Sequence, residues 1–211
     1  MCMSAPSTPA QLRRSLQTTA TRTAIVVAAH RLMLERGYVA TSIGAIAGEA
    51  GVAVQTIYNS VGSKADVLSA VLDLAAAGPD APALVPDLMR RRVAAAVSAP
   101  QIIRILADWF VEVHERTSGV FRVIGQAAAV DPDVAKLEAK RAAGRLHNYG
   151  EAASAMRARR GLRAGLSDHE AAATIWAIGH PQVFRTLVLE AGWSETAYRE
   201  WLEKTLRGAL L

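Results

Sequence analysis

The sequence predicts an all-α protein. Apolar residues recur at spacings of three and four along most of the 211-residue chain, which is the period of a helix with one buried face. No alternation of apolar and polar residues extends over any length, as a half-buried strand would require. The chain is rich in alanine and poor in aromatic residues, and its glycines cluster between the helical segments. A chain of this length can bury a core as one domain or as two small ones.

The first segment, residues 1–19, is rich in serine, threonine, proline and glutamine, and we expect a mobile arm. Arg13 and Arg14 in this arm could contact a DNA backbone or minor groove, or could simply be solvated. A first helix is predicted over 20–36, because its apolar residues form one stripe. Gly37 is expected to end this helix in the left-handed region.

Two short helices are predicted next. Apolar residues at i, i+3, i+4 and i+7 from Ile43 indicate a helix that Thr41 or Ser42 can cap. Gly51 follows at once and suits a tight turn. A second helix then fits 54–59. Two short helices joined by a glycine-containing turn form a helix-turn-helix, which places its second helix in the major groove of DNA.

An ordered set of residues extends this motif on both sides. The set comprises Ala28-Ala29, Leu32, Glu35-Arg36-Gly37-Tyr38, Thr41-Ser42-Ile43, Ile46-Ala47, Ala50-Gly51-Val52, Thr56-Ile57-Tyr58 and Ser63-Lys64. Through these residues the stretch 22–68 resembles the DNA-binding domain of TetR-family repressors. The resemblance implies a three-helix DNA-binding domain, which we place at 20–66, followed by the start of a fourth helix. Ser60 and Val61 depart from it, since the family usually has an aromatic residue there.

The candidate DNA contacts lie in and around the second short helix. Gln55 and Asn59 share one helix face and carry amides that can bond adenine bidentately; a solvated surface is the alternative. By resemblance, Tyr58 contacts a phosphate and Lys64 lies against the DNA backbone. Lys64 also falls in the first turn of a helix that a Ser63–Asp66 capping box opens, where a phosphate would be favoured. The full set of expected DNA-binding residues is Thr41, Ser42, Gln55, Thr56, Tyr58, Asn59 and Lys64.

The remainder of the chain, 67–211, is predicted to be a series of amphipathic helices. The helix that starts at Lys64 must stop near Ala77, because three prolines are spaced through 78–86. Ser167 and Glu170 form a second capping box. The further helices are predicted over 87–97, 101–116, 120–130, 132–160, 168–178, 181–191 and 195–210.

The end of the chain carries a second resemblance. Its pattern is Trp176-Ala177, Pro181, Gly192-Trp193-Ser194, Tyr198, Trp201-Leu202 and Leu206. It resembles the ligand-binding and dimerisation domain of a subset of the same family. Candidates for the ligand pocket, each of which could instead be ordinary core or surface, are Trp109, His114, Phe121, Gln126, His147, Tyr149 and Trp176. Candidates for a dimer interface, with packing inside one chain as the alternative, are Phe184, Trp193, Tyr198 and Trp201.

Charge and motif content narrow the function classes. The net charge is +5, of which +4 falls within residues 1–64, where it can pair with phosphates. The single cysteine, the lack of a signal segment and the lack of an apolar run of ~20 residues favour a cytoplasmic protein without membrane contact. The sequence has no HExxH, no Cys/His cluster, no GxGxxG and no P-loop. We therefore expect no enzyme, no metal and no cofactor.

Three hypotheses follow from the sequence. The first is a sequence-specific transcriptional regulator, a homodimeric repressor that binds a palindromic operator in double-stranded DNA and is released by a small apolar effector. The second is a dimeric DNA-binding protein without an effector, which a tightly packed second domain would favour. The third, an all-helical enzyme, would need convergent titratable groups for which the sequence offers no motif.

Overall fold

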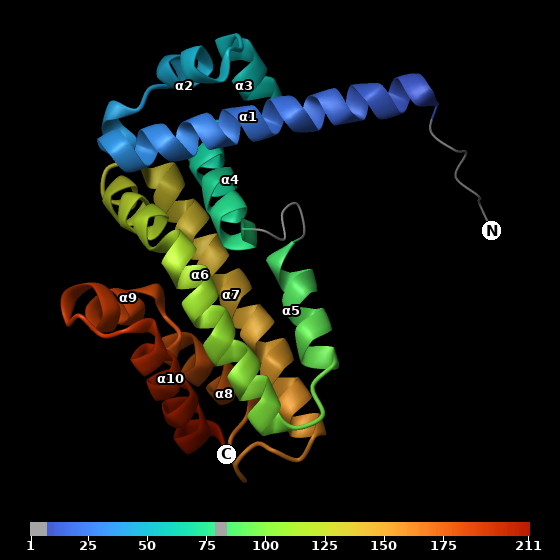
Figure 1. Ribbon diagram of the computed structural model, residues 1–211, viewed down its shortest axis with the longest axis vertical. Coiled ribbons are helices and arrows are strands. Elements are labelled where there is room, and N and C mark those ends of the chain that lie inside the picture. Colours follow the sequence, from blue (N-terminus) through green and yellow to red (C-terminus); the bar gives the residue numbers. More distant parts are fainter. Residues whose placement is uncertain (1–7, 79–83) are drawn as a thin grey trace. The chain divides into compact units, whose positions relative to one another are not determined.

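A computed structural model describes residues 8–78 and 84–211, without the side chains of residues 9–12 and 14. Within these ranges the chain forms helices and no strand, which confirms the all-α prediction (Figure 1). The chain divides into two compact units between Val71 and Leu72. The helices are α1 Pro9–Ala40, α2 Ile43–Ala50, α3 Val54–Ser60, α4 Lys64–Ala77, α5 Val85–Ala94, α6 Ala99–Ala128, α7 Pro132–Ala158, α8 Asp168–Ile178, α9 Pro181–Phe184, the π-helical segment η2 Arg185–Glu190, and α10 Glu195–Leu210.

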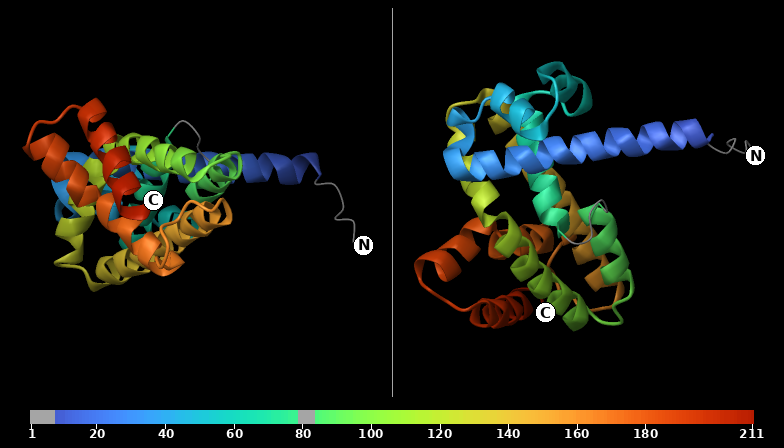
Figure 2. Two further views of the ribbon diagram at one scale, coloured as in Figure 1. Left: turned by 90° about the horizontal axis from the view of Figure 1, so that it is seen from below. Right: turned by 45° about the horizontal axis from the view of Figure 1, so that its top comes forward.

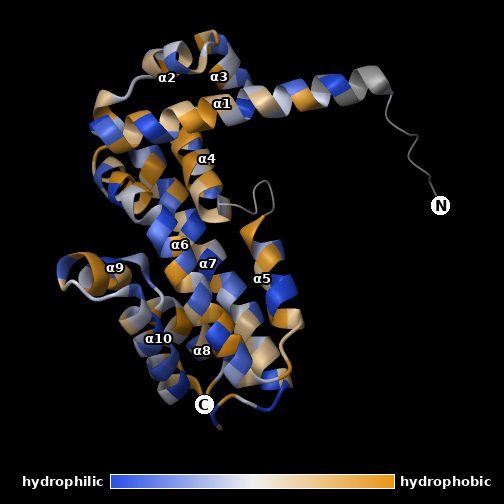
Figure 3. Cartoon of the chain, in the orientation of Figure 1, coloured by the Kyte–Doolittle hydropathy of each residue, from blue (hydrophilic) through white to orange (hydrophobic). Residues whose placement is uncertain are grey.

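The first unit has a core made by one face of each of its helices. Ile25 and Leu32 of α1, Ile46 of α2 and Ile57 of α3 are almost completely buried. Apolar and polar positions alternate around these helices in Figure 3, as an amphipathic helix requires. Because the core is small, each of these aliphatic side chains is important for holding α2 and α3 against α1.

Helix α1 starts earlier than the sequence suggested. We expected residues 1–19 to be an arm and the helix to begin at Ala20, but it begins at Pro9. A proline is well placed at the start of a helix, since its missing N–H has no acceptor there in any case. Residues 1–7 of the expected arm lie outside the described residues. The regular helix is interrupted at Gly37, with φ 79° and ψ 169°. The φ is positive as expected, but this ψ belongs to a region that essentially only glycine enters.

The turn between α2 and α3 has the expected geometry. Ser42 caps α2 and accepts a hydrogen bond from the backbone N–H of Ala45 at 3.0 Å. Gly51 ends α2 in the left-handed conformation, with φ 65° and ψ 34°. This confirms the cap and the glycine turn of the helix-turn-helix.

The second unit is built on α6 and α7, with α8 and α10 packed on them (Figure 2). Its buried core includes Ile103 and Phe110 of α6, Met156 of α7, Ile175 of α8 and Leu206 of α10. Gly179 at the end of α8 lies so close to Phe110 that an added Cβ would overlap the phenylalanine ring. The end of α8 can therefore approach α6 this closely only because residue 179 is a glycine.

Helix α6 corrects another expectation. We predicted separate helices over 101–116 and 120–130, but α6 is continuous from Ala99 to Ala128. The Thr-Ser-Gly sequence between them does not break it, because Thr117 and Val120 are buried in the core of the unit; the Thr117 hydroxyl donates to the carbonyl oxygen of Val113 at 2.6 Å within the helix. The bounds of α7, α8 and α10 agree with prediction to within two residues, and the Ser167–Glu170 capping box is formed. The predicted helix 181–191 is instead a short α9 followed by η2.

The expected interruption at 78–86 falls largely on residues 79–83, which lie outside the described residues. Before it, α4 ends at Ala77, as predicted. After it, α5 covers Val85–Ala94 rather than the predicted 87–97, because Pro86 is tolerated in the first turn of a helix. Within the described ranges, no helix combines the length and the apolar character that a bilayer crossing demands.

Candidate functional site

Helix α3 presents a polar face to solvent. Ile57 is completely buried, whereas Gln55 and Asn59 are exposed and Tyr58 is 50% exposed. Thr56 is half-buried. The Gln55 amide donates to the Asn59 side-chain oxygen at 3.0 Å, so the two amides lie side by side. One face of α3 thus anchors the helix, and the other offers hydrogen-bonding groups to a partner.

Backbone and side-chain bonds fix α3 at both ends. At its start, the N–H of Val52 donates to the carbonyl oxygen of Ala47 at 3.0 Å. At its end, the Arg22 guanidinium donates to the carbonyl oxygen of Ser60 at 2.5 Å, which ties α1 to the end of α3. The N–H of Val61 donates to the carbonyl oxygen of Ile57 at 2.8 Å. Sequence reasoning missed Arg22, because a pattern of residues cannot reveal a contact across 38 positions.

Lys64 stands at the first turn of α4. Its Nζ lies 4.1 Å from the ring centre of Tyr38, which is buried. The expected capping box is formed: the N–H of Ser63 donates to Asp66 Oδ2 at 2.9 Å, and the N–H of Asp66 donates to Ser63 Oγ at 3.2 Å. Gly62 precedes the box with φ 119°, and a Cβ there would press on the Asp66 carboxylate. The lysine is therefore held at the first turn of a helix, where the helix dipole favours an anion such as a phosphate.

Thr41 requires a correction. Its side chain is 1% exposed, and its hydroxyl lies 2.8 Å from the carbonyl oxygen of Gly37 and 3.2 Å from that of Leu32. The hydroxyl therefore satisfies the interrupted end of α1 and has no surface to offer DNA. Ser42, by contrast, is exposed at the N-terminus of α2 while it caps that helix.

The acidic side chains of the first unit all take part in ion pairs or in a helix cap. Glu35 lies 3.4 Å from Arg31, Glu49 also pairs with Arg31, and Asp66 belongs to the capping box. These are the three carboxylates in the range 8–71. Glu49, first, and Glu35 raise the pKa of Arg31. Residues 8–71 still carry six basic side chains against these three acidic ones, and this net charge of +3 attracts a polyanion.

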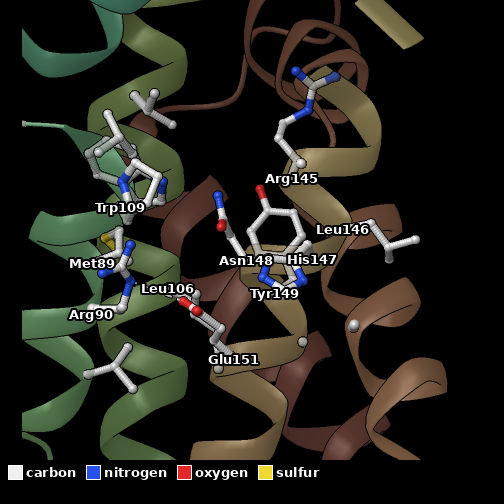
Figure 4. A pocket seen from close by; sticks show the side chains of 18 of the residues that line it. Met89, Arg90, Leu106, Trp109, Arg145, Leu146, His147, Asn148, Tyr149 and Glu151 are labelled. Atoms are coloured by element: carbon white, nitrogen blue, oxygen red, sulfur yellow. Dashed lines mark ion pairs between the residues drawn. The ribbon is translucent and has the colours of Figure 1, made fainter. Parts of the chain in front are cut away.

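The second unit contains a cavity of about 1230 Å³ between α5, α6 and α7, with further lining from α8 (Figure 4). Of the seven pocket candidates, five line it: Trp109, His114, Phe121, His147 and Tyr149. Gln126 does not. It lies five residues after Phe121, so on a helix it faces about 140° away, and it is exposed. Trp176 also does not line the cavity; its ring lies against His180 at 6.3 Å.

Burial keeps the aromatic polar groups of this cavity uncharged. Desolvation, and then the positive groups His180 and Arg145, lower the pKa of His114 to about 3. Desolvation raises the pKa of Tyr149 to about 12. The guanidinium of Arg145 pairs with Glu138 at 2.6 Å. The sequence did not reveal Arg145, because arginines along a helix usually indicate a solvated face.

Two of the four interface candidates belong to the core of the chain itself. Phe184 is 2% exposed and Tyr198 is completely buried, and their rings pack edge to face at 5.3 Å. Trp201 is half-buried and stacks on Tyr198 at 6.1 Å. Trp193 is 37% exposed. Phe184 and Tyr198 therefore have a structural role within one chain, and Trp193 offers the most surface of the four.

The comparisons with known proteins agree with this geometry. Residues 25–71 match the model of the family described as bacterial regulatory proteins, tetR family. The structure of NalD, the secondary repressor of the MexAB-OprM multidrug efflux pump in Pseudomonas aeruginosa, is similar, with a TM-score of 0.72, 19% identity, 92% of this chain covered and 97% of that chain. No curated protein sequence matches.

Two solved FadR structures are also similar. The fatty acid degradation regulator FadR from Bacillus halodurans has a TM-score of 0.69 and 18% identity, with 97% of each chain covered. FadR from Bacillus subtilis, solved with stearoyl-CoA, has a TM-score of 0.68 and 16% identity, covering 90% of this chain and 99% of that chain. At this level of identity the likeness concerns the fold. Residues 25–71 thus match the tetR family in sequence, and the chain as a whole shares the fold of these solved structures.

Proposed function

We propose that this protein is a sequence-specific DNA-binding transcriptional regulator, acting as a homodimeric repressor. Residues 20–66 would be the DNA-binding domain, and 67–211 the effector-binding and dimerisation domain. The observation that carries the proposal is the two-faced α3: Ile57 buried on one side, and Gln55 and Asn59 displayed on the other, within the segment that matches the tetR family.

Each exposed group has a distinct role in this proposal. Gln55 and Asn59 read base edges in the major groove, where an amide can pair with adenine. Tyr58 and Lys64 contact phosphates, with Thr56 beside them and Ser42 at the N-terminus of α2. Phosphate contacts position the protein and supply most of the salt dependence, whereas base contacts select the sequence.

Operator binding tests the proposal directly. Genomic DNA fragments retained by the purified protein would be sequenced, and the recovered site would be titrated by fluorescence anisotropy over a range of salt concentrations. We expect a palindromic site and an affinity that falls steeply with salt, since counterions are released from the phosphates. A salt slope near zero would reject the proposal.

The cavity supports release by a small, largely apolar effector. Its volume of about 1230 Å³ exceeds what side-chain packing leaves by chance, and ligand pockets are typically apolar with few polar groups. An effector acts by binding one conformation more tightly than another. The second candidate function, a DNA-binding dimer without an effector, is disfavoured by the same cavity.

Dimerisation would set the distance between the two copies of α3 that a palindromic DNA site requires. Two copies of α3 must lie about 34–36 Å apart, or a multiple of that distance, to enter successive major grooves on one side of DNA. Trp193, with its exposed ring, and the half-buried Trp201 are the aromatic residues we assign to this interface. Analytical ultracentrifugation would test the dimer, and a protein that stayed monomeric at all concentrations would exclude it.

A further inference from the structure

The cavity of the second unit has two unlike walls. Helices α5 and α6 contribute mainly apolar side chains, among them Met89, Leu106 and Trp109, together with Arg90. Opposite them, α7 contributes Arg145, Asn148 and Tyr149 (Figure 4). A ligand that fills this space must therefore be apolar over much of its surface and carry a polar group on one side.

The arginines that line the cavity already have partners. Arg90 pairs with Glu151 at 3.3 Å, and Arg141 pairs with Asp73 at 2.8 Å. Arg145 pairs with Glu138 at 2.6 Å through Nη2, while its buried Nε has no hydrogen-bond partner within the described residues. The fourth, Arg159, donates to the backbone carbonyl oxygens of Ala96, Ala155 and Val93 at 2.9, 2.8 and 3.3 Å.

The carboxylates that line the cavity are paired as well. Asp73 and Glu151 are the partners just described, and Asp168 pairs with Arg157 at 2.5 Å. A charged ligand would have to displace an existing partner from one of these groups, and that displacement costs most free energy at the least exposed pair, Arg145–Glu138. The charge arrangement therefore selects an uncharged ligand.

Tyr149 is the group placed to recognise such a ligand. Within the described part of the chain, its hydroxyl has no hydrogen-bond partner. The ring is held edge-on to Phe110 at 5.8 Å. Because its pKa is raised to about 12, the phenol stays protonated and can donate at physiological pH. His114 beside the cavity is neutral and contacts the hydroxyl of Tyr198 at 3.5 Å, so it adds no charge.

We propose that the cavity binds an uncharged, predominantly apolar molecule with one oxygen that accepts a hydrogen bond from the Tyr149 hydroxyl, such as an alcohol, ketone or ester. This inference rests on the effector role proposed above and narrows it to a chemical class. It excludes carboxylates and acyl thioesters of coenzyme A as the preferred ligands of this chain, although a solved structure of similar fold holds stearoyl-CoA.

Isothermal titration calorimetry with a matched pair of probes, 1-decanol and decanoate at pH 7.5, tests the proposal on the full-length protein. We expect 1-decanol to bind at least ~10-fold more tightly than decanoate, since only the carboxylate must be desolvated as a charge. Tyr149→Phe should weaken 1-decanol binding about 5- to 10-fold, the value of one neutral hydrogen bond. Thr196→Val, which removes an exposed hydroxyl on α10 outside the cavity lining, is the matched control and should leave 1-decanol binding unchanged.

Three results would overturn the inference: decanoate binding as tightly as 1-decanol, no binding of either probe, or an unchanged 1-decanol affinity in Tyr149→Phe. Thermal melting of both variants checks that each is folded. The DNA titration of the ligand-free protein separates the two proposals. If the protein binds DNA but binds decanoate more tightly than 1-decanol, only the proposed ligand class is wrong. If DNA binding is absent, the proposed function fails whichever probe binds.

Discussion

The side-chain amides of Gln55 and Asn59 are joined by a 3.0 Å hydrogen bond along the exposed face of α3. This bond uses one donor of Gln55 and the acceptor of Asn59. It leaves the Gln55 oxygen and the Asn59 NH₂ group, which belong to exposed residues one turn apart, available to a partner. An acceptor and a donor held in fixed relation are what a base edge in the major groove requires.

Replacing Gln55 with alanine should alter sequence preference rather than attachment. We expect a loss of about 1–3 kcal/mol on the preferred site and relaxed selection at one base pair in each half-site. Asn59→Ala should act in a similar way, because it also removes the bond that orients Gln55. Selection of a randomised operator followed by sequencing measures this. A preference unchanged at every position would show that these amides do not read bases.

Replacing Lys64 with alanine should weaken binding to every DNA sequence by a similar factor. A lost phosphate contact should reduce the salt slope by about 1. Tyr58→Phe tests the phenol hydroxyl in the same way. The matched control is Lys204→Ala, an exposed lysine on α10. Titrations on specific and random DNA at several salt concentrations distinguish the outcomes, and equal slopes for wild type and Lys64→Ala would refute the contact.

Thr41→Val should reduce stability. The two side chains have the same shape, but valine leaves the buried carbonyl oxygens of Leu32 and Gly37 without the hydroxyl. We expect the free energy of unfolding to fall by about 1–2 kcal/mol. Urea denaturation of Thr41→Val and Thr41→Ser measures the change, since serine keeps the donor. If valine matched or exceeded the wild type, the hydroxyl would have no stabilising role.

Gly179→Ala should disturb the contact between α8 and α6. A methyl group there would overlap the Phe110 ring, which is completely buried and cannot easily move. The expected loss of unfolding free energy is about 1–3 kcal/mol. Gly125→Ala is the control, because a Cβ there meets no atom within 4 Å. That variant should be neutral or slightly more stable, as alanine favours a helix. Thermal unfolding of the pair would show the difference.

The neutral state of His114 makes stability fall in acid. Its pKa is about 3 in the folded protein against 6.5 unfolded, so the unfolded chain binds the extra proton between these values. Stability is therefore complete above pH 6.5 and is lost as pH falls toward 3. From His114 alone we expect about 2 kcal/mol less at pH 5 than at pH 7. The lowered pKa values of His30 and His180 act in the same direction.

The variant His114→Gln isolates the contribution of His114 to the loss of stability in acid. Urea unfolding of wild type and variant at pH 7 and pH 5 should show a smaller loss in the variant, because glutamine does not titrate. An equal loss in both proteins would mean that another group dominates the acid response.

Sequence reasoning succeeded where local chemistry determines the structure. The glycine turn at Gly51, the Ser42 cap and both capping boxes follow from the conformations and hydrogen bonds of neighbouring residues. It failed where contacts between residues far apart in the sequence determine the structure. The start of α1 at Pro9 was hidden by a serine- and threonine-rich composition. The Thr-Ser-Gly stretch within α6 suggested a break, but the burial of Thr117 and Val120 in the core keeps the helix continuous.

The candidate sites divide in the same way. The exposed residues of α3 could be assigned from helix periodicity and resemblance. The burial of Thr41, Phe184 and Tyr198 could not, because it depends on which helices meet in space. Arg145 and its partner Glu138 were missed for the same reason, since the cavity that Arg145 lines exists only between helices α5, α6 and α7.

The early start of α1 has a practical consequence for experiments on this protein. Arg22 is the residue that joins α1 to the end of α3, and the helix continues from there back to Pro9. Thirteen residues of helix place the first turn about 20 Å along the axis from that junction. An affinity tag or fluorophore fused at the amino end would thus be carried well clear of α3, so binding assays could use tagged protein without the label covering the face they are meant to probe.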